Sequence, residues 1–424
     1  MRFTRLTPTE YEEFTERVQR LNFMQLPAFA RARAQNGARV EYVGVKDGET
    51  VIGAGVVTFQ RWKKLFSIAH LYFGPTFIDD SEQAQWTFYR GLILWLRQER
   101  TVVSLELVPP IFRRTYSDVT PQDETTEGAD FEKLAEKIDA ERVTKTLYDS
   151  AAIQPSFAYT KFIDGMDFAA AAKSTGQQVR TAFNRWGTNG VEVRFAGPEE
   201  IDVLGDVLAA TAERTLAAAI DDQQLAYYQT IMREAGPEEA FLPIATLHTD
   251  KALELIARER GEIEAKIAQI DEREADLTAQ GKNLGKKQVT ARNEAYKRLE
   301  VLASRESETR ELQEKHGTAV TLAASFFIKS GDELVYLVSG AFAEFNSYYG
   351  IYMIHRAMFD WATSHGIKWY NFWGISGDFS EDAPDAGVLH FKRQFNGYVE
   401  EYVGQYEVLL RPRLAKLLGA SLVD

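Results

Sequence analysis

Trp369-Tyr-Asn-Phe-Trp-Gly-Ile-Ser-Gly-Asp378 is the stretch that decides the fold, and two neighbouring stretches frame it. Tyr348-Tyr-Gly-Ile-Tyr352 precedes it, and Gly387-Val-Leu-His-Phe-Lys-Arg-Gln-Phe-Asn-Gly397 follows it. The apolar spacing predicts a helix over about 351–364, a strand over 368–372 and then a loop that contains glycine. We expect Phe391 and Lys392 to stand at the start of the next structured segment. A strand that ends in a polar, glycine-containing loop commonly carries a site.

Length and composition indicate a soluble protein with two or more domains. The chain has 424 residues, of which 45% are hydrophobic. No apolar run reaches the length of a bilayer span, and the N-terminus lacks the apolar core of a signal peptide. The absence of cysteine excludes disulfides and thiolate metal sites, and the six histidines show no metal-ligand spacing. We therefore expect a cytoplasmic protein without a metal or a cofactor.

The net charge of −13 argues against broad adhesion to nucleic acid or anionic lipid. It leaves room for a local basic site, because salt screens the distant charges more than the near ones.

An insertion over 248–317 has the pattern of a helical hairpin. Apolar residues recur at intervals of seven in its first half, at Ile256, Ile263, Ile270, Leu277 and Leu284. A glycine-containing break at 281–285 separates this seam from a second, weaker one. Two antiparallel arms of about 30 residues would each reach about 45 Å. Strands are expected at 241–247 and 320–328, so the hairpin replaces a turn inside one domain.

The chain also shows signs of an internal repeat. Strands at 40–45 and 51–59, a helix at 82–99 and a strand at 102–107 form the first unit. Strands at 320–328 and 334–339, the helix at 351–364 and the strand at 368–372 form the second. This order indicates an α+β unit used twice.

These motifs resemble the FemABX family, whose members transfer amino acids from tRNA to peptidoglycan precursors. That family has a strand ending in Phe-Gly-Gly-Ile, followed by Gly-Leu-x-x-Phe-Lys-x-x-Phe-Gly. Here Trp373 stands for the first glycine and Val388 for the leucine, and Asn396 precedes Gly397. The resemblance implies two GCN5-type acyltransferase-like domains, 1–155 plus 398–424 and 156–397, with the antiparallel coiled-coil arm 248–317 inserted in the second. The acidic stretch 118–145 would be an excursion of the first domain.

The same resemblance implies the function and the substrate-binding residues. The enzyme would transfer an amino acid from aminoacyl-tRNA to the stem peptide of a lipid-linked or UDP-linked precursor. Gln25 to Arg33 resembles the family pattern Gln-Ser-x-x-Trp-x-x-x-Lys, so Arg33 would hold a phosphate of the precursor. Arg214, in a Thr-x-x-Arg pattern followed by Tyr227-Tyr228, would bind a phosphate or a carboxylate. Either Asp79 or Asp80 could orient an amine, although both are also ordinary turn residues.

Lys392 is the catalytic candidate, and Phe391 would stack on the terminal adenine of the tRNA. Attack of an amine on an aminoacyl ester creates an oxyanion, which a neighbouring cation stabilises. Arg180 and Arg185 either line a groove along the RNA or are solvated. Lysines at the tip of the arm either contact tRNA or belong to a dimerisation arm or a solvated strut: Lys282, Lys286 and Lys287. Peripheral contact with the inner membrane face and a homodimer are further expectations.

Two other functions compete with this one. A GCN5-type acyl-CoA-dependent N-acyltransferase needs a backbone cradle for pyrophosphate, usually Arg/Gln-x-x-Gly-x-Gly/Ala. The chain has Ser347 at the first position and the bulky Tyr352 at the position of close approach, which counts against CoA. A noncatalytic coiled-coil protein would explain the hairpin but not the Phe-Lys motif.

Overall fold

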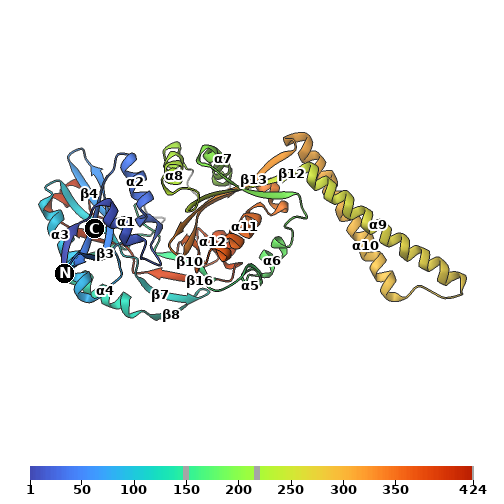
Figure 1. The fold of residues 1–424 in the computed structure, drawn as a ribbon, viewed down its shortest axis with the longest axis horizontal. Coiled ribbons are helices and arrows are strands. Elements are labelled where there is room, and N and C mark those ends of the chain that lie inside the picture. The colour runs from blue at the N-terminus through green and yellow to red at the C-terminus, as the bar shows by residue number, and fades with distance from the viewer. Residues whose placement is uncertain (147–151, 214–219, 423–424) are drawn as a thin grey trace.

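Two β-sheets organise the computed structural model, which describes residues 1–146, 152–213 and 220–422 (Figure 1). Among these residues the first sheet has eight strands in the order β1-β2-β3-β4-β6-β17-β9, with β5 paired to β3. The second sheet has nine, in the order β11-β12-β13-β14-β15-β10-β16-β7-β8. The strands of the first sheet are β1 Arg2–Arg5, β2 Arg39–Asp47, β3 Thr50–Trp62, β4 Phe66–Tyr72, β5 Thr76–Phe77, β6 Val102–Val108, β9 Glu141–Arg142 and β17 Tyr406–Leu409. Those of the second sheet are β7 Phe112–Ser117, β8 Thr120–Glu124, β10 Phe157–Phe162, β11 Val191–Ala196, β12 Ala240–His248, β13 Ala319–Ser330, β14 Glu333–Ala341, β15 Trp369–Ile375 and β16 Tyr398–Tyr402.

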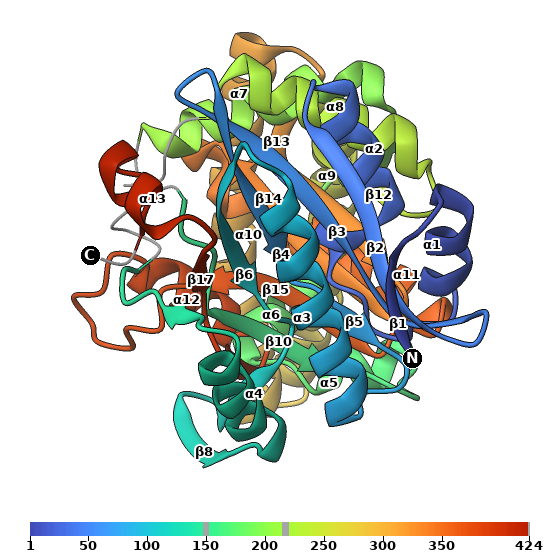
Figure 2. The same cartoon turned by 90° about the vertical axis from the view of Figure 1, so that its left-hand side faces the viewer.

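Helices cover the faces of both sheets (Figure 2). The α-helices are α1 Pro8–Thr15, α2 Pro27–Gln35, α3 Glu82–Gln98, α4 Thr126–Lys137, α5 Phe168–Lys173, α6 Gln177–Phe183, α7 Ile201–Ala212, α8 Asp222–Ala235, α9 Thr249–Ala279, α10 Lys286–His316, α11 Gly350–Ser364, α12 Ala386–Arg393 and α13 Pro412–Leu418. Short 3₁₀ helices occur at η1 Phe23–Gln25, η2 Pro198–Glu200 and η3 Ala343–Tyr348.

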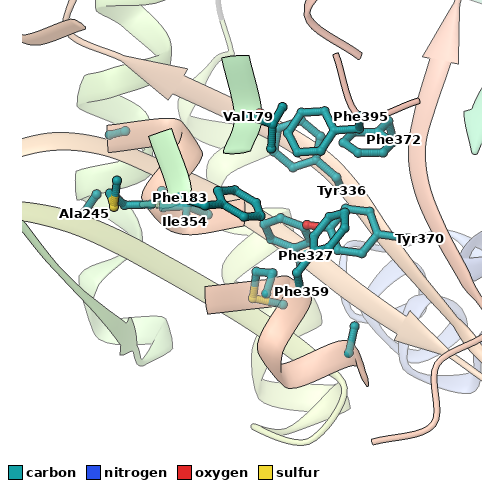
Figure 3. Packing of buried hydrophobic residues seen from close by; sticks show 14 of the residues in the cluster. Val179, Phe183, Ala245, Phe327, Tyr336, Ile354, Phe359, Tyr370, Phe372 and Phe395 are labelled. Carbon is teal, nitrogen blue, oxygen red and sulfur yellow. The ribbon is translucent and has the colours of Figure 1, made fainter. Parts of the chain in front are cut away.

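One central helix crosses each sheet because its apolar residues recur every three to four positions. Helix α3 buries Phe88, Leu92 and Leu96 in the core of the first sheet. Helix α11 buries Ile354 and Phe359, among others, against aromatic residues of the second sheet (Figure 3). These two cores hold the parallel strand pairs that α3 and α11 connect.

The two sheets repeat one topology, as the predicted pair of GCN5-type units requires. In the first, β3 pairs with β4 antiparallel, and β4 pairs with β6 parallel across α3. In the second, β13 pairs with β14 antiparallel, and β14 pairs with β15 parallel across α11. The repeat therefore matches β3 with β13. The internal repeat predicted from the sequence matches the strand at 40–45 with the strand at 320–328. That match is shifted by one strand, because the sequence pattern does not reveal β4.

The strands of the two sheets cross the predicted boundaries at 155 and 398. Strands β7 and β8 precede residue 155 and pair in the second sheet, whereas β17 pairs in the first. Strand β16 begins at Tyr398 and also belongs to the second sheet. Both termini lie at the end of the molecule formed by the first sheet (Figure 1). The division of the chain into two domains at those boundaries stays a prediction.

A half-buried arginine joins the two halves. Arg20 donates to Glu333 on β14 at 2.6 Å and to Glu400 on β16 at 2.7 Å. Its guanidinium also lies 5.0 Å from the ring centroids of Phe112 and Trp369. Breaking such a pair would leave a carboxylate buried without a counter-charge, so this contact fixes the relative position of the halves.

The predicted helical hairpin is present and projects away from the sheets (Figure 1). Its two helices, α9 and α10, each contain 31 residues, close to the expected length. The hairpin leaves β12 and returns to β13 at neighbouring residues, since His248 pairs with Ala319. The α+β architecture with an inserted arm is thus confirmed. Among the described residues, none of the helices combines the length and the apolar character of a membrane span.

Candidate active site

A cleft opens where two parallel strands of the second sheet separate. Strands β14 and β15 pair only from Glu333–Trp369 to Val335–Asn371, although both continue further. The opening has a volume of about 840 Å³. Its lining includes the end of β14, the start of α11 and one face of α12. The carboxyl end of a separated strand pair is a common place for a ligand.

The start of α11 supplies backbone donors to this cleft. Tyr349 precedes the helix in the left-handed region, with φ of 62°, and no side chain caps the first turn. The first N–H groups of a helix have no partner within it, and they carry a partial positive charge. Gly350 allows close packing here, because a Cβ at this position would lie 2.8 Å from the Cβ of Leu322. Gly350, Ile351 and Tyr352 all line the cleft.

Lys392 lies in the same cleft, and its charge is held in a buried place. It is only 5% exposed, and Nζ donates to the carbonyls of Trp373 at 3.1 Å and Gly374 at 2.7 Å. An ammonium has three N–H donors, so one is left for a ligand. Burial lowers the pKa of Lys392 to about 7, and the Asp385 carboxylate opposes this shift. Phe391 and Lys392 lie in the last turn of α12, so the expectation that they stand at the start of a structured segment is wrong.

The backbone conformation of Trp373 directs its carbonyl oxygen toward the Lys392 ammonium. Trp373 has φ of 61°, a region that glycine tolerates and a bulky residue rarely adopts. Its N–H donates to Asn371 Oδ1 at 2.6 Å, and its ring packs on Phe23 and Phe73 of the first half. The position is the one where the resembling family has glycine, so the contacts of Trp373 with the first half hold a conformation that is otherwise unfavourable.

Several cleft residues escaped the sequence reasoning because their contacts are long-range. Asp385, 6% exposed, accepts from Ser376 N at 2.7 Å and from Ser376 Oγ, and so ties the loop after β15 to α12. Gln178 on α6 donates to the Tyr352 hydroxyl at 3.1 Å. Phe391 also lies at the cleft, where its ring is 5.6 Å from that of Tyr352.

The remaining predicted substrate residues lie away from Lys392. Arg33 on α2 donates to the carbonyl of Met24 at 2.9 Å. Phe29 of the same helix contacts Tyr227 on α8, with ring centroids 6.3 Å apart, so the structure brings these two predicted motifs together. Asp79 caps the turn before α3 by accepting from Ser81 N, and Asp80 is exposed beside it. Arg214 lies outside the described residues.

The predicted RNA-binding residues are spread over three places. The Arg180 guanidinium on α6 donates hydrogen bonds to the carbonyls of Lys173 and Thr175 and to the side chain of Gln177. Arg185 follows α6 and reaches the base of the arm. The three lysines lie at the far tip of the arm, where α9 ends and α10 begins: Lys282, Lys286 and Lys287.

Comparison with known proteins agrees with this fold. The chain matches the family model of the FemAB family over residues 6–420. It is similar to aminoacyltransferase FemA of Staphylococcus epidermidis, with 25% identity over 96% of this chain and 95% of that protein. It is also similar to aminoacyltransferase FemA of Staphylococcus aureus, with 26% identity over 96% and 94% of the two chains. The crystal structure of FemX has a similar fold, with a TM-score of 0.76 at 18% identity over 98% of this chain and 99% of that one. Because the match to the family model covers nearly its whole length, the chain belongs to the FemAB family.

Proposed function

We propose that this aminoacyltransferase moves an amino acid from aminoacyl-tRNA to the stem peptide of a peptidoglycan precursor, building an interpeptide bridge. The relatives named aminoacyltransferase FemA support the class of reaction. The observation that carries the proposal is the buried Lys392 at the cleft between β14 and β15.

The reaction needs positioning and charge more than covalent catalysis. The acceptor amine attacks the ester carbonyl, so a C–N bond forms and a tetrahedral oxyanion develops. The Lys392 ammonium and the first N–H groups of α11 stabilise that charge. The C–O bond to the ribose then breaks, the tRNA hydroxyl leaves with a proton, and the amine loses one to a carboxylate or to the RNA. Phe391 stacks on the terminal adenine.

The acceptor is assigned to the side of the first half. Arg33, on α2 beside α8, binds a phosphate or a carboxylate of the precursor. Arg33→Ala is expected to weaken precursor binding by about 1.5–3 kcal/mol, the usual range for a charge-assisted hydrogen bond. Titration of the variant with a nucleotide-linked precursor measures this, and unchanged affinity would remove Arg33 from the acceptor site.

The acceptor is either lipid-linked or nucleotide-linked. A lipid-linked acceptor brings the enzyme to the inner face of the membrane, and flotation with vesicles containing the precursor tests this. A homodimer through the arm is a separate proposal, which the mass in solution with and without the arm tests.

A transfer assay tests the function directly. The protein is mixed with a panel of labelled aminoacyl-tRNAs and with either precursor, and with acetyl-CoA as the donor of the competing N-acyltransferase. We expect label to appear on the precursor from one or a few tRNAs and none from acetyl-CoA. Transfer from acetyl-CoA without transfer from any tRNA would replace the proposal by its competitor.

A further inference from the structure

A narrow crevice lies where the helical arm meets the second sheet. It has a volume of about 80 Å³ and lies between the turn after α6, the two arm helices and η3. The lining of this opening, here called the arm-base crevice, includes Arg185, Asn189, Glu259, Arg305, Glu308, Tyr348 and Tyr349.

Contacts around the crevice hold the base of the arm in place. Thr309 on α10 shares a hydrogen bond of 3.0 Å with the Tyr348 hydroxyl, and Asn189 donates to the Tyr348 carbonyl at 3.1 Å. On the other side, Gly190 lies so close to Ala252 on α9 that a Cβ would approach it to 2.7 Å. The crevice is therefore a built part of the structure and does not depend on the position of the arm's tip.

Two arginines line the crevice together, and among the described residues neither forms an ion pair. Five other arginines of the arm form ion pairs with carboxylates of the arm: Arg258, Arg260, Arg292, Arg298 and Arg310. Within the described part of the chain, the side chains of Arg185 and Arg305 have neither an ion pair nor a hydrogen bond, although both are half-buried. Burial lowers the pKa of Arg305, and the charges of Arg185 and Arg298 lower it further.

The acidic residues of the crevice are engaged elsewhere. Glu259 accepts from Arg298 at 2.6 and 2.9 Å, and its charge partly offsets the repulsion that lowers the pKa of Arg305. Glu308 accepts from Ser304 on its own helix at 3.0 Å. Two cations placed together at an energetic cost, neither of them in an ion pair, form a site suited to an anion.

The crevice leads to the catalytic cleft through one residue. Tyr349 lines both the crevice and the cleft of Lys392. Its ring lies 6.1 Å from that of Tyr352, which in turn lies 5.6 Å from Phe391. A row of three aromatic rings thus runs from the two arginines to the residue beside Lys392.

We propose that the arm-base crevice binds the single-stranded acceptor end of the tRNA, with Arg185 and Arg305 on its phosphates and Tyr349 under a base. This rests on the proposed function, which makes aminoacyl-tRNA the donor. A strand that carries phosphates and stackable bases matches a pair of cations followed by a row of aromatic rings. The ester at the end of the strand then enters the cleft of Lys392.

Three variants and one control test the proposal. Arg185→Ala, Arg305→Ala and the double variant each remove one or both free guanidinium groups. Arg310→Ala removes the same charge from the same helix as Arg305, but that guanidinium is occupied by Glu306 at 2.8 Å. Affinity is measured for uncharged tRNA and for a minihelix with its single-stranded 3′ end. Transfer is measured from aminoacyl-tRNA and from 3′-aminoacyl adenosine, which carries no phosphates.

We expect each single variant to lose about tenfold in affinity for both RNAs, since each removes a charge-assisted hydrogen bond. For the double variant, the slope of log affinity against log salt should fall by about 1.4, or about 0.7 for each phosphate on a single strand. Transfer from aminoacyl adenosine and affinity for the precursor should not change. Arg305→Ala should melt at the same temperature as the parent or higher, because it relieves repulsion.

The outcomes separate this inference from the proposed function. A parent that transfers from tRNA, with RNA affinity unchanged in the double variant, overturns the inference alone. RNA binding that depends on both arginines in a protein that transfers nothing overturns the proposed function and keeps the crevice as an RNA site. Weaker binding of the precursor with intact RNA binding would assign the arginines to the acceptor and overturn the inference.

Discussion

The two halves of the molecule share one topology but separate their strands at different places. In the first sheet, β4 and β6 stay paired from Ser67–Val102 to Tyr72–Val108, and the gap lies between β3 and β4 beyond Thr58–His70. In the second sheet, β13 and β14 stay paired to Ala323–Ala341, and the gap lies between β14 and β15.

The two gaps also differ in what occupies them. In the first, the Gln25 side chain donates to the Tyr72 carbonyl at 2.7 Å and accepts from Val56 N at 2.7 Å. It replaces the missing strand contacts, and it is only 1% exposed. In the second, the cleft stays open and Lys392 stands at it. The same unit thus becomes a scaffold in one half and a candidate active site in the other.

The largest loss of transfer activity should follow substitution of Lys392, which lies at the open cleft of the second half. Lys392→Met is expected to lower transfer by about 10²–10³-fold, the usual loss when one donor to an oxyanion is removed. Lys161→Met is the matched control, because Lys161 is 4% exposed and donates to the carbonyl of Asn396 at 3.3 Å, yet does not line the cleft. Steady-state transfer rates of both variants decide. Equal losses would mean that Lys392 acts only as a buried structural lysine.

The second-largest effect on transfer should come from the connection between two equivalent strand pairs, β2 with β3 in the first half and β12 with β13 in the second. Strands β2 and β3 are joined by the two-residue turn Gly48-Glu49, whereas β12 and β13 carry the arm. Replacing residues 249–318 by Gly-Glu should leave a folded protein, because His248 and Ala319 are already paired. Transfer from aminoacyl-tRNA should fall by at least about tenfold, because the deletion removes the phosphate contact of Arg305 and leaves Arg185 in place. Transfer from aminoacyl adenosine is the control, and its equal loss would show that the arm supports the fold of the cleft.

Local sequence patterns predicted the elements that depend on local periodicity. Helix α11 begins at Gly350 and ends at Ser364, as the apolar spacing predicted, and the arm helices lie inside 248–317. The catalytic and substrate-binding roles of Lys392 and Phe391 stay predictions, although both residues line the cleft at the start of α11.

Long-range pairing could not be read in this way. Strand β16 joins the second sheet and β17 joins the first. Each of them pairs with a strand that lies hundreds of residues earlier in the chain. Whether an arginine is free depends on its neighbours in space, which is why Arg180 and Arg185 looked equivalent in sequence but differ in the structure. The role of Gln25 was hidden too, because its partners lie on β3 and β4.

A smaller effect on transfer should follow from pH. Because the pKa of Lys392 is about 7, its ammonium is present at lower pH and is lost as the pH rises through that value. If the cation stabilises the oxyanion, kcat should fall above pH 7 by up to about tenfold per unit. Lys392→Arg should move this fall to higher pH, since arginine keeps its charge. A rise in kcat through pH 7 that Lys392→Met abolishes would make the neutral amine the active form.

The smallest effect on transfer should come from substituting Gln25, which fills the gap between β3 and β4 in the first half. This substitution should instead lower the stability of the protein. Gln25→Leu keeps the volume but leaves the Tyr72 carbonyl and the Val56 N–H buried without their side-chain partner. An unsatisfied buried group costs about 1–3 kcal/mol, so the free energy of unfolding should fall by about 2–6 kcal/mol. Transfer at a temperature where the variant is folded should stay within about twofold of the parent, because Gln25 does not line the cleft of Lys392. Urea unfolding and transfer rates measured on the same samples test both parts. Large loss of transfer with little loss of stability would mean that the gap between β3 and β4 belongs to a substrate site, and the contrast between a closed and an open half would no longer hold.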